Sequence, residues 1–466
     1  MRYVSTRGQA PALDFGDVLL AGLAADGGLY VPDRWPTLSP AARTGRPGGG
    51  GYADLAAEVM WPFVAGTYAR TRFDELVRDA CAGFDHPDVV PLVELDDDLW
   101  LLELFHGPTL AFKDIALQLV GRLFDEELAR RGERVTIVGA TSGDTGSAAI
   151  EAVRDRHNIQ VVILHPHGRV SEMQRRQMTT VDSANVHNIA VEGTFDDCQD
   201  LVKAMFVDPD FRAEHKLSAV NSINWARVMA QTAYYVAAVN ALERVPVAFS
   251  VPTGNFGNVL AGHVARHMGL AVDRFVVASN RNDILTQFFT TGAMAISEVQ
   301  PTLSPSMDIQ VSSNLERFLF ELLDRDGHRT AAVLERFRAD GGMQLDPAIA
   351  ARLRQGWTGV RVDDAETTET IAELYRSTGR IIDPHTAVGL AAARRARGPS
   401  SGPMVVLATA HPAKFGDAVA AAIGKPPPMP PALAALADRP EHVVRLPNDL
   451  ATVKAHVARC AAPAGG

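Results

Sequence analysis

The sequence predicts an α/β protein with a largely parallel sheet. Between about residues 89 and 424, short apolar runs alternate with stretches of helical periodicity, which is the order expected of strand–helix repeats. The expected strands, such as residues 135–138, 161–164 and 247–251, are almost continuously apolar, as is typical of parallel strands buried on both faces. Ligands of such sheets bind at the carboxyl ends of the strands, and the most unusual loops of this sequence follow those ends.

The expected elements follow one another regularly along this part of the chain. The helical stretches carry apolar residues three or four positions apart, for example Leu119 and Leu123. We expect strands at residues 100–105, 135–138, 161–164, 247–251, 275–277 and 404–407, and helices from about residue 114 and at residues 147–154, 259–267 and 417–423.

The two ends of the chain differ from this pattern. Residues 26–32 (DGGLYVP) indicate a turn and a short strand, and residues 52–84 have helical spacing. The glycine-rich run at residues 44–51 is interpreted as a surface loop, and the run KPPPMPP from Lys425 as a stiff linker. We therefore expect a small N-terminal domain at residues 1–88, α/β domains at residues 89–424, and a linker with a C-terminal segment at residues 425–466.

The bulk composition excludes several classes of protein. The chain has 466 residues, 47% of them hydrophobic and 21% charged, as in globular proteins. A net charge of −10 argues against nucleic acid as the main partner. No signal region opens the sequence, and no uncharged apolar run reaches the roughly 18 residues of a membrane helix. Three widely spaced cysteines suggest neither a disulfide framework nor a metal site. We expect a cytoplasmic protein with no membrane partner and no metal.

Lys113 is the residue most suggestive of chemistry. It lies in the run HGPTLAFKD at residues 106–114, in apolar company between an expected strand and an expected helix. Loss of hydration disfavours the ammonium form, and a neutral amine can condense with an aldehyde. Of the six lysines, only Lys113 and Lys414 have settings suited to such chemistry. The alternative interpretation is an ordinary lysine at a helix start.

Two loops have the composition of anion sites. In the loop at residues 253–258 (TGNFGN), Gly254 and Gly257 permit close backbone approach, and the following helix offers unpaired amides to a phosphate. The GxGxxG spacing of dinucleotide sites is absent. The loop at residues 140–146 (ATSGDTG) supplies hydroxyls and a second helix start, but no lysine of a P-loop. Taken singly, each loop is also compatible with an ordinary capped turn.

Two further groups follow expected strands or precede helices. Asn221 and Ser222 can cap the helix that follows them, and Arg227 lies further along it, where a guanidinium could bind a phosphate or carboxylate. Thr409 stands at the end of the last expected strand, where its hydroxyl could meet a ring nitrogen. One candidate imine lysine, one cofactor-phosphate loop and further anion groups together predict pyridoxal phosphate.

With these motifs the sequence resembles the threonine synthase family, which belongs to the fold type II (tryptophan-synthase-β-like) pyridoxal-phosphate enzymes. HGPTLAFKD, TSGDTG, NSIN, GNFGN and TAHPAKF occur in the family's order, and STRG at residues 5–8 with DGGLYVP resembles its N-terminal domain. The resemblance extends to about Gly424. It implies two parallel-sheet α/β subdomains with the cofactor in the cleft, plus the small N-terminal domain.

The resemblance also implies residue roles. Lys113 would bind the cofactor covalently and move protons, and Thr409 would face the pyridine nitrogen. Asp144 would border the cofactor's O3′ side, where a carboxylate needs a proton or a compensating partner. The cofactor phosphate would be held by Gly254, Asn255, Phe256, Gly257 and Asn258. The substrate's anionic groups would be held by Thr141, Ser142, Gly143, Thr145, Asn221, Ser222 and Arg227.

The implied reaction converts O-phospho-L-homoserine and water to L-threonine and phosphate, by γ-elimination followed by β-addition, as the last step of threonine biosynthesis. The enzyme would be a monomer or a homodimer. A related type II phospholyase or dehydratase, or a non-catalytic ligand-binding paralogue, is the alternative. The residues Asn221, Ser222 and Arg227 favour the synthase, because a dehydratase has no distal phosphate to bind.

Overall fold

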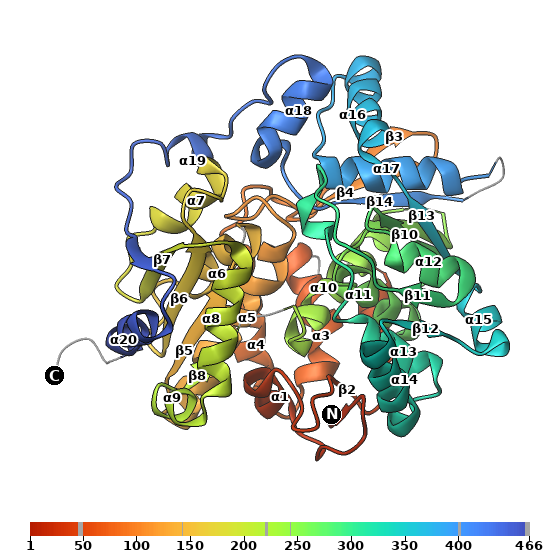
Figure 1. Ribbon diagram of the computed structural model, residues 1–466. Helices are drawn as coiled ribbons and strands as arrows, with labels where there is room; N and C mark the ends of the chain where they lie inside the picture. Colours follow the sequence, from red (N-terminus) through yellow and green to blue (C-terminus); the bar gives the residue numbers. More distant parts are fainter. Residues whose placement is uncertain (45–49, 142, 220–221, 243, 399–401, 462–466) are drawn as a thin grey trace. The chain divides into compact units, whose positions relative to one another are not determined.

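The computed structural model describes residues 1–44, 50–141, 143–219, 222–242, 244–398 and 402–461 (Figure 1). Its internal contacts divide the chain into two compact units. Unit 1 comprises Met1–Phe112 and Ser222–Pro428, and unit 2 comprises Lys113–Asn221 and Met429–Gly466. Each unit is built around one large sheet with helices on its faces, as the alternating apolar pattern predicts.

The sheet of unit 1 has the strand order β13-β10-β9-β14-β4-β3. Neighbouring strands are parallel, except that β3 runs antiparallel to β4. Its strands are β3 (Leu92–Asp96), β4 (Leu99–Glu103), β9 (Val247–Pro252), β10 (Val272–Ser279), β13 (Trp357–Arg361) and β14 (Met404–Ala408).

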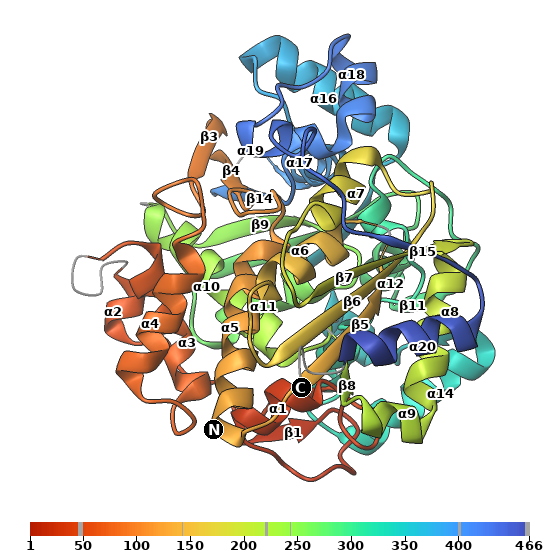
Figure 2. The same ribbon diagram turned by 90° about the vertical axis from the view of Figure 1, so that its left-hand side faces the viewer.

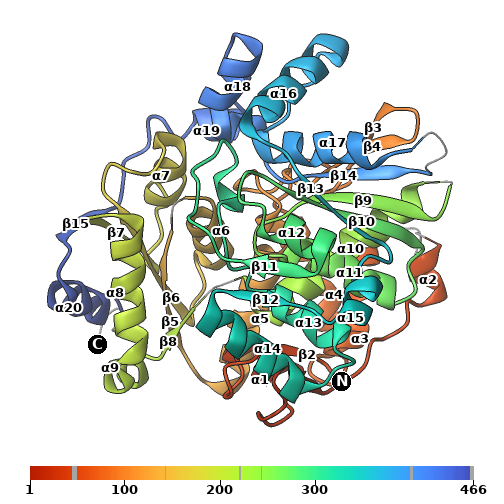
Figure 3. The ribbon, with the colours of Figure 1, turned by 45° about the vertical axis from the view of Figure 1, so that its right-hand side comes forward.

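Both faces of this sheet are covered, which explains its continuous apolar strands. Helix α17 (Pro384–Ala396) packs on one face, where Ala248 and Val406 belong to the core it shares with α16 (Asp364–Thr378) (Figure 3). Phe249 follows Ala248 and therefore points to the opposite face. There its ring contacts Tyr235 of α10 (Trp225–Ala241), with 4.9 Å between the ring centroids. Helix α11 (Gly257–His267) packs against α10 on this side.

The N-terminal elements of unit 1 pack on α10. Tyr3 Oη donates to the Phe63 carbonyl at 2.7 Å, and the Phe63 ring contacts the buried Trp225 ring. The helical pattern at residues 52–84 is interrupted, because Gly66 has a φ of 94° and the chain turns there. The helical spacing predicted there corresponds to two helices, α3 and α4, with a turn between them. The elements are β1 (Tyr3–Ser5), α1 (Phe15–Ala21), β2 (Tyr30–Pro32), α2 (Pro40–Arg43), α3 (Tyr52–Val64) and α4 (Arg70–Cys81).

The rest of unit 1 consists of short elements around the sheet. One small antiparallel pair, β11 with β12, lies among them. They are α12 (Ile284–Thr291), β11 (Ala293–Ala295), the 3-10 helix η1 (Pro305–Met307), α13 (Leu315–Leu322), α14 (Gly327–Asp340), β12 (Gly342–Gln344), α15 (Pro347–Leu353), η2 (Pro412–Phe415) and α18 (Gly416–Ile423).

Unit 2 contains a fully parallel sheet in the order β15-β7-β6-β5-β8 (Figure 2). Its strands are β5 (Val135–Ala140), β6 (Ile159–Pro166), β7 (Val186–Glu192), β8 (Leu217–Ser218) and β15 (Val444–Pro447). Its helices are α5 (Lys113–Arg131), α6 (Asp144–Val153), α7 (Glu172–Thr179), α8 (Phe195–Val207), α9 (Pro209–Glu214), α19 (Pro431–Ala434) and α20 (Leu450–Ala461).

The C-terminal segment belongs to the sheet of unit 2. Strand β15 pairs with β7 in parallel. In α20, Val453 and Val457 are fully buried in the core that α8 shares with the strands. Strand β15 lay outside the elements expected from the sequence. The domain boundaries at residues 88 and 424 stay a prediction. No helix among the described residues is long and apolar enough to span a bilayer.

Candidate functional site

The loop at residues 253–258, called the glycine loop below, follows β9 at the carboxyl end of the unit 1 sheet. Gly254 has no room for a side chain, because a Cβ there would lie 2.6 Å from the Ser306 carbonyl oxygen. Phe256 adopts the left-handed conformation, with a φ of 61°, at the N-cap of α11. No side chain caps the first amides of this helix among the residues the structure describes. Backbone donors at a helix start with little side-chain cover can bind an anion, and the assignment of this loop to a phosphate stays a prediction.

Two side chains of this loop, Phe256 and Asn258, contact the interior of the protein. Phe256 is fully buried and stacks on Phe289 with 5.8 Å between ring centroids. Asn258 Oδ1 accepts from Tyr234 Oη at 2.6 Å and from Tyr235 Oη at 2.9 Å. Asn258 Nδ2 is buried with no hydrogen-bond partner in the described chain. Phe256 can therefore serve an anion only through its backbone, whereas Asn258 retains one donor.

The loop that precedes Lys113 is anchored beside Thr409. Phe112 N donates to the Thr409 carbonyl at 2.9 Å, and His411 N donates to the Leu110 carbonyl at 3.0 Å. Strands β9 and β14 are parallel neighbours, so Thr409 and the glycine loop follow strand ends at the same edge of the sheet. Lys113 is half-buried, and comes directly after Phe112 as the first residue of α5.

Lys414 has a structural task in the same loop. It is 4% exposed, and its Nζ donates to the Thr109 carbonyl at 2.7 Å. This contact fixes the loop from the side of η2. Lys113 therefore keeps its place as the candidate for covalent chemistry.

His106, the first residue of the HGPTLAFKD run, joins two carboxylates. Its Nδ1 lies 3.0 Å from Asp85 Oδ1, and its Nε2 lies 2.9 Å from Glu103 Oε2. Glu103 also accepts a hydrogen bond from Arg380 at 2.9 Å. His411, the N-cap residue of η2, interacts electrostatically with His106. Burial lowers the pKa of His106, but the hydrogen bonds and charges of Glu103 and Asp85 outweigh it, so the pKa is raised above 6.5.

This arrangement predicts a pH-dependent stability. A histidine whose pKa is raised in the folded state adds to the free energy of unfolding. This stabilisation is fully present below the unfolded-state pKa, near 6.5, and is lost as the pH rises through the folded-state pKa. His106→Gln should lower the free energy of unfolding by about 1 kcal/mol at pH 6 and by less at pH 9. Denaturant titrations at the two pH values measure this. Exposed His157 gives the control H157Q, and an H106Q protein with the wild-type pH slope contradicts the prediction.

The second predicted loop belongs to unit 2, between β5 and α6. Thr141 Oγ1 is buried and accepts from Gly143 N at 3.0 Å and Gly146 N at 2.9 Å. Its hydroxyl therefore shapes the loop. Thr145 is half-buried in the first turn of α6, and Ser142 lies outside the described residues.

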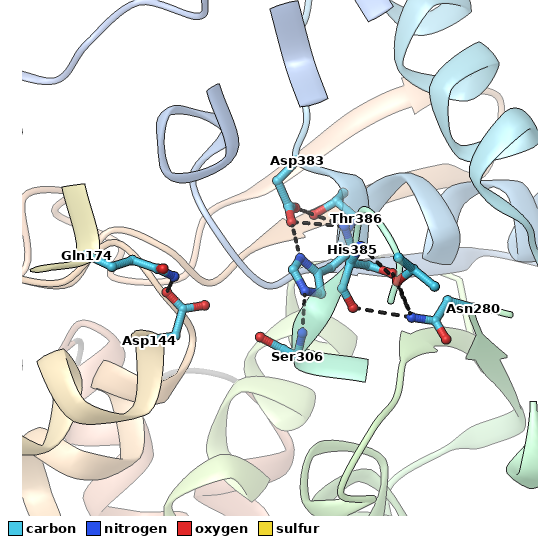
Figure 4. Close-up of polar contacts among 9 residues, drawn as sticks. Asp144, Gln174, Asn280, Ser306, Asp383, His385 and Thr386 are labelled. Atoms are coloured by element: carbon cyan, nitrogen blue, oxygen red, sulfur yellow. Dashed lines mark hydrogen bonds and ion pairs between the residues drawn. The ribbon is translucent and has the colours of Figure 1, made fainter. Parts of the chain in front are cut away.

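Asp144 accepts a hydrogen bond from a neighbouring helix. It is 8% exposed at the start of α6, and Gln174 Nε2 of α7 donates to Asp144 Oδ1 at 3.0 Å (Figure 4). The helix start also favours a negative charge. Sequence reasoning missed Gln174, because the contact joins residues 30 positions apart.

The start of α10 differs from the predicted cap. Asn224 is the N-cap, since its Oδ1 accepts from Ala226 N at 3.0 Å. The expectation that Ser222 and Asn221 cap this helix was wrong for Ser222, whose half-buried hydroxyl lies 3.1 Å from Ser313 Oγ. Asn221 lies outside the described residues.

Arg227 is a buried cation in α10. It is 5% exposed, and its Nε and Nη1 have no hydrogen-bond partner among the residues described. Burial lowers the pKa of its guanidinium to about 10. Two buried guanidinium nitrogens without acceptors are costly, and an anionic ligand would remove that cost. No group of residues suited to a metal ion occurs in the described part of the chain.

Comparisons with known proteins point to one family. Three family models match: "Threonine synthase N terminus" at residues 2–81, "Pyridoxal-phosphate dependent enzyme" at residues 88–337, and "Threonine synthase, C-terminal" at residues 386–457. Threonine synthase of Pseudomonas aeruginosa is 54% identical, with 98% of each chain covered.

Solved structures give the same result. The crystal structure of PLP-bound threonine synthase from Brucella melitensis has a TM-score of 0.96 and 48% identity, with 99% of each chain covered. Yeast threonine synthase has a TM-score of 0.94 and 38% identity, with 98% of each chain covered.

Proposed function

The chain belongs to the threonine synthase family of pyridoxal-phosphate enzymes, and from this we propose that its substrate is O-phospho-L-homoserine, converted with water to L-threonine and phosphate. In that conversion the γ-carbon loses phosphate and the β-carbon gains a hydroxyl. The substrate carries a carboxylate and a phosphate, which matches a chain with more anion-binding groups than a cofactor alone requires.

The residues of the glycine loop fit the phosphate of pyridoxal phosphate. The loop offers uncapped amides at the start of α11, a Gly254 position closed to any Cβ, and an unpartnered Asn258 Nδ2. These are donors without acceptors, which suits a phosphate monoester. When bound, the cofactor supplies an electron sink that makes the substrate's α-proton removable.

The roles of the polar residues follow from their positions. We propose that Lys113 holds the cofactor covalently and then takes the α-proton, and that Thr409 meets the ring nitrogen. The first backbone amides of α6, at Asp144 and Thr145, bind the substrate carboxylate, and Thr141 holds the amides of Gly143 and Gly146 in the loop that presents them. Asp144, supported by Gln174, borders the cofactor's O3′ side.

The leaving group needs its own stabilisation. We assign Ser222 and Arg227, with Asn221, to the substrate phosphate. A guanidinium binds phosphate oxygens with charge-assisted hydrogen bonds, and it stabilises the negative charge that builds on the departing phosphate. The buried position of Arg227 strengthens this effect, because water does not screen the charge.

One observation carries this proposal. Residues 110–112 pair with residues 409–411 at the sheet edge that also bears the glycine loop. The segment that ends at Lys113 is thus fixed where parallel sheets bind their ligands.

The test is a product assay with O-phospho-L-homoserine. We expect phosphate and threonine in equal amounts. Phosphate accompanied by a keto acid without threonine indicates the phospholyase alternative. A protein that binds the cofactor without releasing phosphate indicates a dehydratase or the non-catalytic paralogue.

We also propose a cytoplasmic location and a monomer or homodimer. The support for the location is chemical: Cys81, Cys198 and Cys460 are all free thiols, as is usual in a reducing compartment. Size-exclusion chromatography with light scattering measures the oligomeric state.

A further inference from the structure

Residues 312–314 contact the glycine loop at consecutive positions. Ser312 Oγ donates to the Gly254 carbonyl at 2.8 Å, and Ser313 Oγ donates to Asn255 Oδ1 at 3.2 Å. Asn314 donates twice to the Asn255 carbonyl, from its backbone N at 3.2 Å and from Nδ2 at 3.0 Å. Three successive residues that precede α13 therefore hold the loop, Ser312 and Asn314 through its backbone and Ser313 through the Asn255 side chain.

The same residues contact Ser222. Asn314 Nδ2 donates to the Ser222 carbonyl at 3.1 Å, in addition to its bond to Asn255. Ser313 Oγ lies 3.1 Å from Ser222 Oγ. One amide nitrogen thus joins the loop assigned to the cofactor phosphate with a residue assigned to the substrate phosphate, and all of them belong to unit 1.

Arg317 fixes the orientation of this amide. Its Nη1 donates to Asn314 Oδ1 at 2.6 Å, and its Nη2 donates to the Ile223 carbonyl at 2.6 Å. Because a guanidinium only donates, Oδ1 must face Arg317 and Nδ2 must face the two carbonyls. Both side chains are almost completely buried, Asn314 at 0% and Arg317 at 1% exposure. Burial lowers the pKa of Arg317 to about 9.

The glycine loop is also supported through η1. The Ser306 carbonyl packs on Gly254. Ser306 N donates to His385 Nε2 at 3.3 Å, and the other ring nitrogen of His385 lies 2.7 Å from Asp383 Oδ2 (Figure 4). This second support packs on Gly254, whereas Asn314 bonds to both the loop and Ser222.

We propose that Asn314 is a positioning residue that holds the glycine loop and Ser222 in one fixed register, so that the cofactor phosphate and the substrate phosphate bind as a matched pair. This inference rests on the proposed function, because it uses the assignment of these residues to the two phosphates. Asn314 acts through the backbone of Asn255 and Ser222. Its loss should therefore weaken phosphate recognition while leaving the covalent chemistry of Lys113 intact.

The experiment compares two forms of the cofactor. Apoprotein is titrated with pyridoxal phosphate and with pyridoxal, which lacks the phosphate, and the ratio of the two affinities isolates phosphate recognition. We expect Asn314→Ala to lower this ratio about tenfold, as for the loss of two hydrogen bonds. Its KM for O-phospho-L-homoserine should rise more than its kcat falls. Ser313→Ala, at a half-buried position, should lower the ratio about threefold.

Asn185 supplies the matched control. It is also buried, and its Nδ2 donates to the backbone carbonyls of Val153, Arg156 and Ile159 in unit 2. Asn185→Ala should lower the melting temperature and leave the ratio unchanged. The proposal is overturned if N314A and S313A keep the wild-type ratio within about twofold, or if N185A lowers it as much as N314A. If N314A does not fold, S313A decides.

This result is independent of the product assay. The affinity ratio needs no substrate, so a wild-type protein that fails to form threonine overturns the proposed function alone. An active wild type whose variants keep the ratio overturns the role of Asn314 alone.

Discussion

Lys113→Ala should lower the turnover of O-phospho-L-homoserine by at least about 10²–10⁴-fold, the usual contribution of a positioned general base. The loss should be larger still, because the same amine is proposed to hold the cofactor. Cofactor should remain bound through the glycine loop, but no longer covalently. Borohydride treatment followed by mass spectrometry measures the covalent attachment, and phosphate release measures turnover.

Lys203→Ala is the matched control for this variant. Lys203 is exposed and pairs with Asp200 at 2.9 Å on the surface of α8, and its removal should leave both measurements unchanged. If K113A still carries a borohydride-reducible cofactor, the assignment of Lys113 is wrong, and Lys414 becomes the residue to test.

The second large effect is expected at Arg227. Arg227→Met should lower kcat/KM for O-phospho-L-homoserine by about 10- to 100-fold, as for the loss of charge-assisted hydrogen bonds to an anion. The same variant should raise the free energy of unfolding without ligand by about 1–3 kcal/mol, because two buried donors without partners are removed. A substitution that lowers activity and raises stability is typical of a charged residue that is kept for function although it destabilises the fold.

Arg317→Met tests why the free energy of unfolding should rise in R227M. Arg317 is equally buried, but its guanidinium donates to three acceptors, the carbonyls of Tyr30 and Ile223 and Asn314 Oδ1. Its removal leaves those acceptors unsatisfied, so R317M should lower the free energy of unfolding where R227M raises it. Denaturant titrations of the two variants make the comparison. Equal destabilisation by both would show that Arg227 is satisfied in the folded protein, and would remove the argument that it awaits an anion.

The candidate residues differ in how far the sequence could assign them. Gly254, Gly257 and the strand before them form a local pattern, and local patterns survive in the fold because they depend only on neighbouring residues. Thr141 illustrates the limit, since its hydroxyl is engaged by two amides of its own loop. The sequence showed a hydroxyl, and only the fold showed what it bonds.

The N-cap of α10 shows that the sequence could not decide between cap candidates two positions apart. Ser222 and Asn224 are both good N-cap residues, and sequence reasoning chose the first of these. In the structure the cap is Asn224, whose Nδ2 also donates to the Leu19 carbonyl, 205 positions away. A distant carbonyl contributes to the choice between two adequate local candidates.

The sequence by itself determined the α/β class, the order of strands and helices, and the loops that follow the strand ends. These depend on the period of apolar residues and on glycine, which act over a few positions. Only the tertiary structure showed the contacts of Asn314, because the residues it joins lie 59 and 92 positions away. It also brought β15 to the edge of the unit 2 sheet. Hydrogen bonds between distant segments leave no periodic trace in a sequence, so the residues that position a site are found only when the chain is folded.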